Sequence, residues 1–151
     1  MSRVLIDSSL LIEYFKGNPK AVEIFENLKT SPVALLINPI VFSEVSYLFL
    51  RYSTKKSRFD FTPEVVKSSK IETLFVLLNS FGILDLTKEI VILAENIMVK
   101  YGLLPNDALI LATCKFYGIK YLISLDGDFK EPCVKEGIEL IESAEKLKLI
   151  E

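Results

Sequence analysis

Short apolar runs alternate with longer amphipathic stretches along the whole chain. The run at residues 33–37 (VALLI) is apolar without alternation, which is typical of a strand covered on both faces. By contrast, Val22, Phe25 and Leu28 follow one another at three-residue spacing, which indicates a helix. Runs of the first kind predict strands at residues 3–6, 33–37, 82–86, 121–124 and 137–141.

Capping residues mark the ends of the predicted helices. Asn–Pro or Thr–Pro pairs, which supply an N-cap and a proline at the first helical position, occur at residues 18–19, 38–39 and 62–63. Glycines that stop a helix stand at positions 17, 102 and 118. These signals predict helices at about residues 8–16, 19–29, 39–52, 63–79, 90–101, 106–117 and 143–151.

The alternation of strands and helices predicts an α/β fold. Its central parallel sheet of about four to five strands would be covered by helices on both faces. The 151 residues contain no internal repeat, low-complexity segment or linker, so residues 1–151 are expected to form a single domain.

Half of the residues are hydrophobic and the mean hydropathy is +0.37, which is high for a soluble chain of this size. We therefore expect part of the apolar surface to lie at a subunit or partner interface, the alternative being a large core alone. No apolar run approaches the roughly 18 residues of a membrane span. Asp7 interrupts the first apolar stretch, which does not fit a signal peptide. The expected location is the cytoplasm, without membrane association.

Charge and composition exclude several function classes. The net charge of −2 and pI near 5.4 argue against tight, sequence-independent duplex binding, although an enzyme with brief contacts to nucleic acid is compatible. The two cysteines, Cys114 and Cys133, form no CxxC spacing, and there is no histidine. Zinc hydrolases, Ser-His-Asp triads and Cys-His nucleophiles are therefore excluded as ordinarily built.

Four acidic residues lie within otherwise apolar stretches: VLIDSSLLIEYF, INPIVFSEVSYLF, LLPNDALILATC and YLISLDGDF. An ionised carboxylate in such surroundings costs several kcal/mol unless a cation or strong donors compensate it. One such residue has little meaning, but four at comparable positions suggest a shared cation. A divalent-metal site is thus the leading hypothesis, with ligands Asp7, Glu44, Asp107 and Asp126.

The predicted fold brings these acids to one edge of the sheet. In open α/β sheets, ligands bind beyond the carboxyl ends of the strands. Asp7 and Asp126 follow predicted strands, and Asp107 stands in the first turn of its helix. Glu44 lies about one and a half turns into the helix after the second strand. Asp128 adds a weaker fifth candidate ligand, two residues after Asp126.

Oxygen ligands without nitrogen or sulfur suit Mg²⁺ or Mn²⁺ rather than zinc or copper. Such a site lowers the pKa of a bound water and stabilises charge on a phosphate. Without histidine, that water is the expected nucleophile, and a carboxylate could serve as its base. The residues alone therefore indicate metal-dependent phosphoryl chemistry, and they do not specify a nuclease.

Each acid also has a purely structural interpretation. Asp107 could cap its helix, and Asp128 could be a turn residue in LDGDF. Glu44 could lie on a solvated helix face, although its neighbours leave little polar face around it. Asp7 is the hardest to explain structurally, because an acid that closes a buried strand has no routine structural role.

The segments VLIDSSLLI, PIVFSEV, PNDALILATC and SLDGDF resemble, in this order, the motifs of the PIN-domain family. The short length makes the chain look most like the VapC-type ribonuclease toxins of prokaryotic toxin–antitoxin pairs. The resemblance implies a three-layer α/β/α sandwich, Mg²⁺ or Mn²⁺ dependence and endoribonuclease activity. It also implies a homodimer and, for a toxin, an antitoxin protein as partner.

Carried over by position, the family's acidic quartet falls on Asp7, Glu44, Asp107 and Asp126. Ser124 matches a small hydroxyl residue before the last acid, and Ser8 or Ser9 matches the polar residue after the first. Asp128 matches a frequently acidic position. The chain departs from the family in Ser9, where Asn is frequent, and in having few basic residues to bind RNA.

The only basic cluster comprises Arg51, Lys55, Lys56 and Arg58. With Tyr52 and Phe59 interleaved, it could contact an RNA backbone, but it could equally be a solvated loop between helices. The apolar helix faces at 42–50 and 65–78 are expected to be mostly core. In the family, the corresponding helices form part of a clip for an antitoxin segment or a second subunit.

The resulting hypothesis is a metal-dependent endoribonuclease that hydrolyses RNA phosphodiester bonds as the toxin of a toxin–antitoxin pair. One alternative is a PIN-type nuclease of RNA processing or quality control without an antitoxin. A receiver-like Mg²⁺-binding signalling domain also places acids at strand ends. A catalytically silent binding module with the same fold is the third alternative.

Overall fold

The computed structural model describes residues 1–150 and contains one parallel sheet. Its strands are ordered β3-β2-β1-β4-β5, with bounds β1 (Ser2–Ile6), β2 (Val33–Ile37), β3 (Gly82–Ile83), β4 (Tyr121–Ile123) and β5 (Glu139–Ile141). The central strand β1 pairs with both β2 and β4, so that Val4 lies opposite Leu35 on one side and Tyr121 on the other. The predicted α/β fold with a parallel sheet is confirmed.

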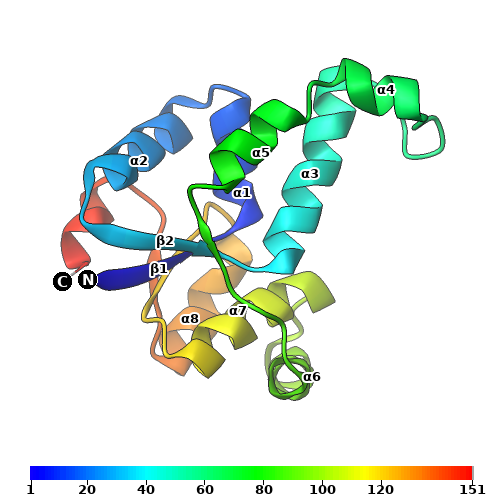
Figure 1. Cartoon of the computed structure of the whole chain (residues 1–151). Coiled ribbons are helices and arrows are strands. Elements are labelled where there is room, and N and C mark those ends of the chain that lie inside the picture. Colours follow the sequence, from blue (N-terminus) through cyan, green and yellow to red (C-terminus); the bar gives the residue numbers. More distant parts are fainter. Residues whose placement is uncertain (151) are drawn as a thin grey trace.

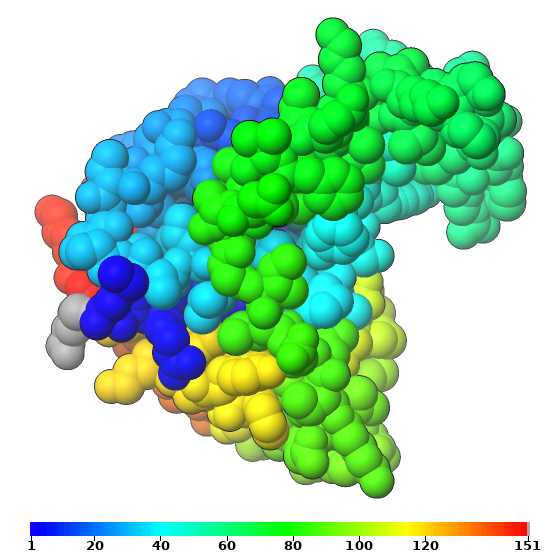
Figure 2. All heavy atoms as spheres, in the orientation of Figure 1, coloured from blue at the N-terminus to red at the C-terminus, as the bar shows by residue number. Residues whose placement is uncertain are grey.

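Helices cover both faces of the sheet (Figure 1). One face carries α1 (Ser8–Phe15), α2 (Pro19–Thr30), α3 (Pro39–Thr54) and α5 (Glu72–Leu78). The other carries α6 (Lys88–Tyr101), α7 (Pro105–Tyr117) and α8 (Lys130–Glu136). The short α4 (Pro63–Ser68) stands out from the body beyond the end of α3 (Figure 2). The three-layer α/β/α arrangement is confirmed.

The predicted caps form the helix starts. The side chain of Asn18 accepts the backbone N–H of Lys20 at 3.0 Å at the start of α2. Asn38 accepts that of Val41 at 3.0 Å in α3, which satisfies a backbone donor at the helix start. Helix α6 ends at Gly102, whose φ of +71° is a left-handed conformation that glycine adopts without strain.

The core lies on both faces of the sheet, as the unpatterned apolar runs predict. Val4, Leu5 and Ile6 of β1 are all completely buried, although successive side chains point to opposite faces. Leu122 and Ile123 of the neighbouring β4 are equally buried. A polar hydrogen bond at 2.9 Å between Asn38 and Thr113 lies inside this core and ties α3 to α7.

The region around α4 differs from the prediction. The single helix expected at residues 63–79 is broken into α4 and α5, because Lys70 adopts a left-handed conformation with φ +56°. The apolar face expected to be core at 65–78 is buried in α5, at Leu74 and Leu78, but the expectation is wrong for α4. No residue of α4 is buried, and Val76 of α5 is 74 % exposed.

Towards the C-terminus, three shorter elements differ. The strand expected at 82–86 is limited to β3, and the helix α8 has no counterpart in the prediction. The tail expected as a helix at 143–151 contains a 3₁₀ turn, η2 (Glu145–Leu149), and Glu151 lies outside the described residues. In the described part of the chain, no helix is long and apolar enough to cross a membrane.

Candidate metal centre

The central strands β1 and β4 deliver two of the predicted acids to the same edge of the sheet. They are parallel neighbours, with Ile6 opposite Ile123, and Asp7 directly follows Ile6. The backbone N–H of Asp7 still donates to the carbonyl of Ile123 at 2.9 Å, which extends the pairing by one step. Asp126 follows β4 three residues later. The carboxyl edge of the sheet is thus the floor of the site.

Asp7 is held by hydroxyl groups in a buried position. Its Oδ2 accepts hydrogen bonds from Ser9 Oγ at 2.7 Å and Ser124 Oγ at 2.8 Å. The backbone N–H of Ser9 also reaches Oδ2 at 3.4 Å, which makes Asp7 the N-cap of α1. The cap is a structural role that the sequence interpretation of Asp7 did not foresee. All of these bonds go to Oδ2, so Oδ1 is left for another ligand.

The surroundings of Asp7 raise its pKa above the ordinary value. Burial is the largest cause, because only 3 % of the residue is exposed, and the nearby charge of Glu44 adds to it. The hydrogen bonds from Ser9 and Ser124 act in the opposite direction. The same hydroxyls accept from the loop after β4, Ser9 from Leu125 N–H and Ser124 from Asp126 N–H, each at 3.0 Å. The two serines therefore fix the loop and the carboxylate together.

The carboxylate of Glu44 in α3 accepts hydrogen bonds from two other helices. Its Oε1 accepts from Ser8 Oγ of α1 at 2.9 Å, and its Oε2 accepts from Asn106 Nδ2 of α7 at 3.3 Å. The carboxylate is therefore not on a solvated helix face. Asn106 is a residue that the sequence interpretation missed, although it stands beside Asp107 in the segment PNDALILATC.

Three of the five predicted acids form one close group. Asp107, Asp126 and Asp128 each offer one oxygen, and these oxygens lie within 4.8 Å of one another. Asp107 makes no cap hydrogen bond, since the N-cap position of α7 is Leu104. Asp128 does occupy a turn, where its N–H donates to Asp126 Oδ1 at 2.9 Å. That structural role leaves its carboxylate in the cluster.

Burial and repulsion by the neighbouring carboxylates make Asp107 a weaker acid. Its pKa is raised to about 7, with desolvation by burial as the largest cause. The charges of Asp7, Asp126, Glu44 and Asp128 add to the effect, in that order. The other four predicted acids therefore all act electrostatically on Asp107.

Within residues 1–150, the ion pairs lie away from this acidic group. None of the ion pairs among the described residues involves any of the five acids. The donor set consists of carboxylate oxygens, which fits a hard divalent cation such as Mg²⁺ or Mn²⁺. The close group of Asp107, Asp126 and Asp128 therefore fits such an ion, and Asp7 and Glu44 lie outside this close group.

The residues predicted to contact substrate are placed in two groups. Ser8, Ser9 and Ser124 make their hydrogen bonds to the acids themselves. The basic residues Arg51, Lys55 and Lys56 line a separate groove of about 570 Å³ between α1 and α3. Arg58 does not line it and instead stacks over Phe59, at 4.7 Å from the ring centroid.

Comparison with known proteins identifies the family. The PIN domain family matches residues 4–135. The chain is 41 % identical over 141 residues to "Ribonuclease VapC2" of Methanocaldococcus jannaschii, covering 92 % of this chain and 95 % of the relative. "Ribonuclease VapC6" of the same organism is 38 % identical over 143 residues, covering 86 % and 92 %.

A solved structure shows the same fold. The chain aligns with a "Toxin-antitoxin complex from Klebsiella pneumoniae" with a TM-score of 0.63 at 24 % identity, over 84 % of this chain and 90 % of that one. The family match spans the strands and helices that carry all five acids. The chain therefore belongs to the PIN-domain family, and within it resembles the ribonucleases named VapC.

Proposed function

We propose that this chain is a metal-dependent endoribonuclease that hydrolyses RNA phosphodiester bonds, and that it is the toxin of a toxin–antitoxin pair. One observation carries the proposal: Asp107, Asp126 and Asp128 form a close acidic group, Asp7 and Glu44 add their charge to it, and none of the five forms an ion pair among the described residues. The relatives named ribonucleases supply RNA as the substrate class. We treat residues 1–151 as one such domain.

The proposed ligands of the cation are Asp7, Glu44, Asp107 and Asp126, with Asp128 as an additional candidate. When bound, the Mg²⁺ or Mn²⁺ ion supplies positive charge for the scissile phosphate and acidifies a water molecule. Asp7 would offer Oδ1, since its hydrogen bonds occupy Oδ2. Ser9 and Ser124 would keep Asp7 ionised and oriented, as hydroxyl donors do for a buried carboxylate.

The remaining residues position the acids and handle the proton. Ser8 and Asn106 each hold one oxygen of Glu44, so its carboxylate cannot rotate freely. Asp107 is the candidate general base, because its carboxylate lies in the close acidic group beside the water that the metal would acidify. It would take a proton from the attacking water as the water oxygen forms its bond to phosphorus, and would return that proton to the ribose oxygen as the bond from phosphorus to this oxygen breaks.

The partners are part of the same proposal. We expect a homodimer and a small antitoxin protein that binds the folded chain. Some of the exposed apolar residues outside the core would lie in these interfaces: Leu48, Val76, Val91 and Val99 are 40 %, 74 %, 56 % and 83 % exposed. Sedimentation of the purified chain tests the dimer. A nuclease of RNA processing without an antitoxin would act alone and would not require a dedicated inhibitor in its host.

The decisive experiment is a cleavage assay on total RNA with Mg²⁺, Mn²⁺ or EDTA, using the parent chain beside Asp7→Asn. We expect cuts that require a divalent ion and that disappear in the variant. Thermal unfolding should show a folded variant, because an Asn oxygen can accept the same hydroxyl donors. Cleavage by Asp7→Asn at the parent rate would refute the site assignment.

A receiver-like signalling domain predicts a different product. Incubation with a small-molecule phosphodonor such as acetyl phosphate should leave the chain unmodified. A stable aspartyl-phosphate, detected as a mass increase by mass spectrometry, would favour the signalling alternative over the nuclease. A silent binding module would neither cleave RNA nor become phosphorylated.

A further inference from the structure

Two side-chain hydrogen bonds join α3 to α7, one at the metal centre and one in the core. The outer bond runs from Asn106 Nδ2 to Glu44 Oε2 at 3.3 Å. The inner bond runs from Asn38 Nδ2 to Thr113 Oγ1 at 2.9 Å, and both of these residues are completely buried. The outer bond orients a proposed metal ligand directly, whereas the inner bond lies away from the acids.

The spacing of the bonded residues matches on the two helices. Asn38 stands six residues before Glu44, and Thr113 stands seven residues after Asn106. At 1.5 Å per residue, these separations correspond to about 9 Å along α3 and about 10 Å along α7. The residue order is opposite on the two helices, so the bonds hold them at two separate points. Two such points fix the register of one helix against the other, whereas a single bond would let the helices pivot.

Neighbouring groups determine the direction of the inner bond. Asn38 is the N-cap of α3, and its Oδ1 accepts the N–H of Val41 at 3.0 Å. With this oxygen turned towards α3, the Nδ2 group faces Thr113 and can only donate. Thr113 Oγ1 accepts that bond and donates its own proton to the carbonyl of Leu109 at 2.7 Å. A shift of α7 by one residue would leave the buried amide without its acceptor, which the core does not tolerate cheaply.

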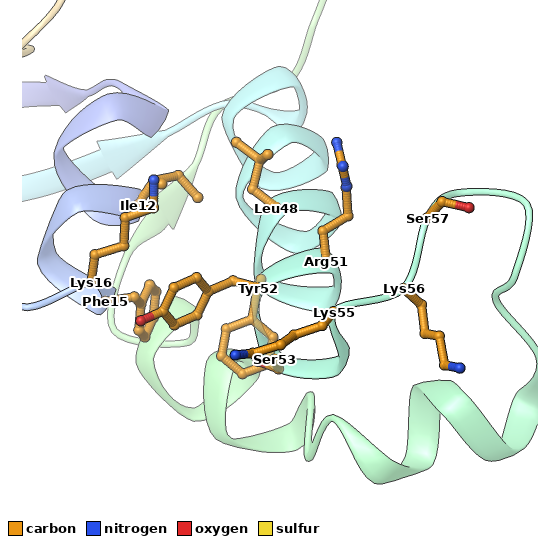
Figure 3. A pocket seen from close by; sticks show the side chains of 11 residues that line it. Ile12, Phe15, Lys16, Leu48, Arg51, Tyr52, Ser53, Lys55, Lys56 and Ser57 are labelled. Atoms are coloured by element: carbon orange, nitrogen blue, oxygen red, sulfur yellow. The ribbon is translucent and has the colours of Figure 1, made fainter.

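The register of these helices matters because each carries a proposed ligand. Glu44 lies in α3, and Asp107 lies in the first turn of α7. A shift of one residue would move a ligand by about 1.5 Å, whereas a site of this kind needs its groups within about 0.5 Å. Beyond Glu44, α3 continues along the separate groove where Figure 3 shows Leu48 and Tyr52. Only the first two turns of α3 are therefore involved here.

We infer that Asn38 and Thr113 are positioning residues for the metal centre. Their buried bond sets the register of α3 against α7, and thereby the place of Glu44 relative to Asp107. Both act through the helices, since their side-chain hydrogen bonds go to each other and to the backbone. The expected effect on cleavage rests on the proposed function. The alternative is a bond that only stabilises the fold, whose loss would leave the activity of the folded chain unchanged.

Substitutions at Thr113 separate positioning from stability. Thr113→Val removes the hydroxyl and keeps the shape, whereas Thr113→Ser keeps the hydroxyl and loses a methyl group. Both should unfold at lower urea concentration, because one leaves a buried amide unpaired and the other leaves a small cavity. Where circular dichroism shows both to be folded, Thr113→Val should cleave a fluorogenic RNA with kcat about 10- to 100-fold lower and KM little changed. Thr113→Ser should cleave at nearly the parent rate.

Asn38→Ser separates the bond between the helices from the cap of α3. Serine caps a helix about as well as asparagine, but its single short hydroxyl cannot also reach Thr113. Asn38→Ser should therefore lose cleavage as Thr113→Val does. The double variant should lose no more than either single variant, because both substitutions break the same bond.

An NMR signal gives a readout without metal or RNA. In EDTA, the side-chain amide signal of Asn106 reports its bond to Glu44. In Thr113→Val and Asn38→Ser, this signal should move towards its position in Glu44→Ala, which lacks the acceptor. In Thr113→Ser it should stay at the parent position.

Thr30→Val is the control for the substitution itself. The hydroxyl of Thr30 donates to the carbonyl of Asn27 in its own helix at 3.1 Å. Thr30 ends α2 shortly before β2 begins, at the opposite edge of the sheet from the acids. This variant should cleave at the parent rate and leave the Asn106 signal unchanged.

Equal kcat in folded Thr113→Val and Thr113→Ser, whether high or low, would overturn the inference. An Asn106 signal that does not move in Thr113→Val would overturn it as well. Absence of all cleavage by the parent chain would instead refute the proposed function, and the Asn106 signal would still decide whether the inner bond sets the register.

Discussion

Two carboxylates in this molecule, Asp107 and Glu136, have opposite environments. Asp107 faces four other acids and no cation, and its pKa is raised to about 7. Glu136 accepts from Lys115 at 2.6 Å, from the hydroxyl of Tyr101 and from Lys100 at 3.1 Å, which lowers its pKa to about 2. Lysine side chains thus neutralise the structural carboxylate Glu136, whereas no ion pair among the described residues neutralises Asp107.

The two regions also differ in what they join. Glu136 ends α8 and links it to Lys100 of α6 and Lys115 of α7, so its charge stabilises one helical layer. Asp107 lies in the first turn of α7, and the charges of Asp7 after β1 and Asp126 after β4 act on it. An acid that lowers stability yet is surrounded by more acids is typical of a functional site. This contrast leads to separate predictions for activity and for stability.

The largest expected effect is on cleavage by Asp107→Asn. Removal of a proposed ligand and base should lower the rate of RNA cleavage by more than about 100-fold, since loss of even an outer partner of a metal site costs about 10- to 100-fold. The rate is measured with a fluorogenic RNA in Mn²⁺. Glu136→Gln serves as the control and should cleave at nearly the parent rate. A similar loss of cleavage rate in both variants would contradict the assignment of a catalytic role to Asp107 and a structural role to Glu136.

A second prediction concerns stabilisation by the metal. Divalent ions that bind only the folded chain at about 100 times their dissociation constant should add roughly 2.7 kcal/mol to the free energy of unfolding. Melting curves with Mg²⁺ or Mn²⁺ against EDTA measure the shift. It should persist in Glu136→Gln and shrink in Asp107→Asn. A shift of the same size in Asp107→Asn would remove that residue from the ligand set.

A third prediction concerns stability without metal, for which Glu136 should be important. Glu136→Gln should lower the free energy of unfolding by roughly 1–2 kcal/mol, because two lysines and a tyrosine lose a charged acceptor in a largely shielded position. Urea denaturation in EDTA measures the loss. The matched control is Glu131→Gln, whose partner Lys135 lies one turn away on the exposed surface, and it should change nothing measurable.

The sequence could place the acids because their positions depend on local patterns. Asp7 and Asp126 follow apolar strand signals, and parallel strands bring their carboxyl ends to one edge. Glu44 and Asp107 follow from proline-marked helix starts. The sequence could therefore predict that these four acids lie near the same edge of the sheet.

Contacts between distant elements could not be predicted in this way. The bond from Asn106 to Glu44 joins residues 62 positions apart, and Asn is also an ordinary helix-start residue. The break between α4 and α5 occurs at Lys70, where the sequence has no glycine that would indicate a left-handed residue. The short α8 contains Pro132, which is tolerated in a first turn but reads as a breaker in sequence. In each of these cases the local sequence preference does not decide between the alternatives.

The smallest expected effect is a pH dependence that runs in opposite directions in the two regions. The pKa of Asp107 is raised from 3.8 to about 7 on folding, so the metal-free chain holds that proton more tightly when folded. Its stability should therefore fall as pH rises from about 4 to 7, and solvent screening at this half-exposed site limits the loss to about 1 kcal/mol. For Glu136 the lowered pKa gives stability that is present above pH 4.5 and lost towards pH 2. Urea titrations in EDTA should show a flatter profile between pH 4 and 7 for Asp107→Asn than for the parent. An unchanged profile would mean that repulsion at the acidic edge does not limit the stability of the metal-free chain.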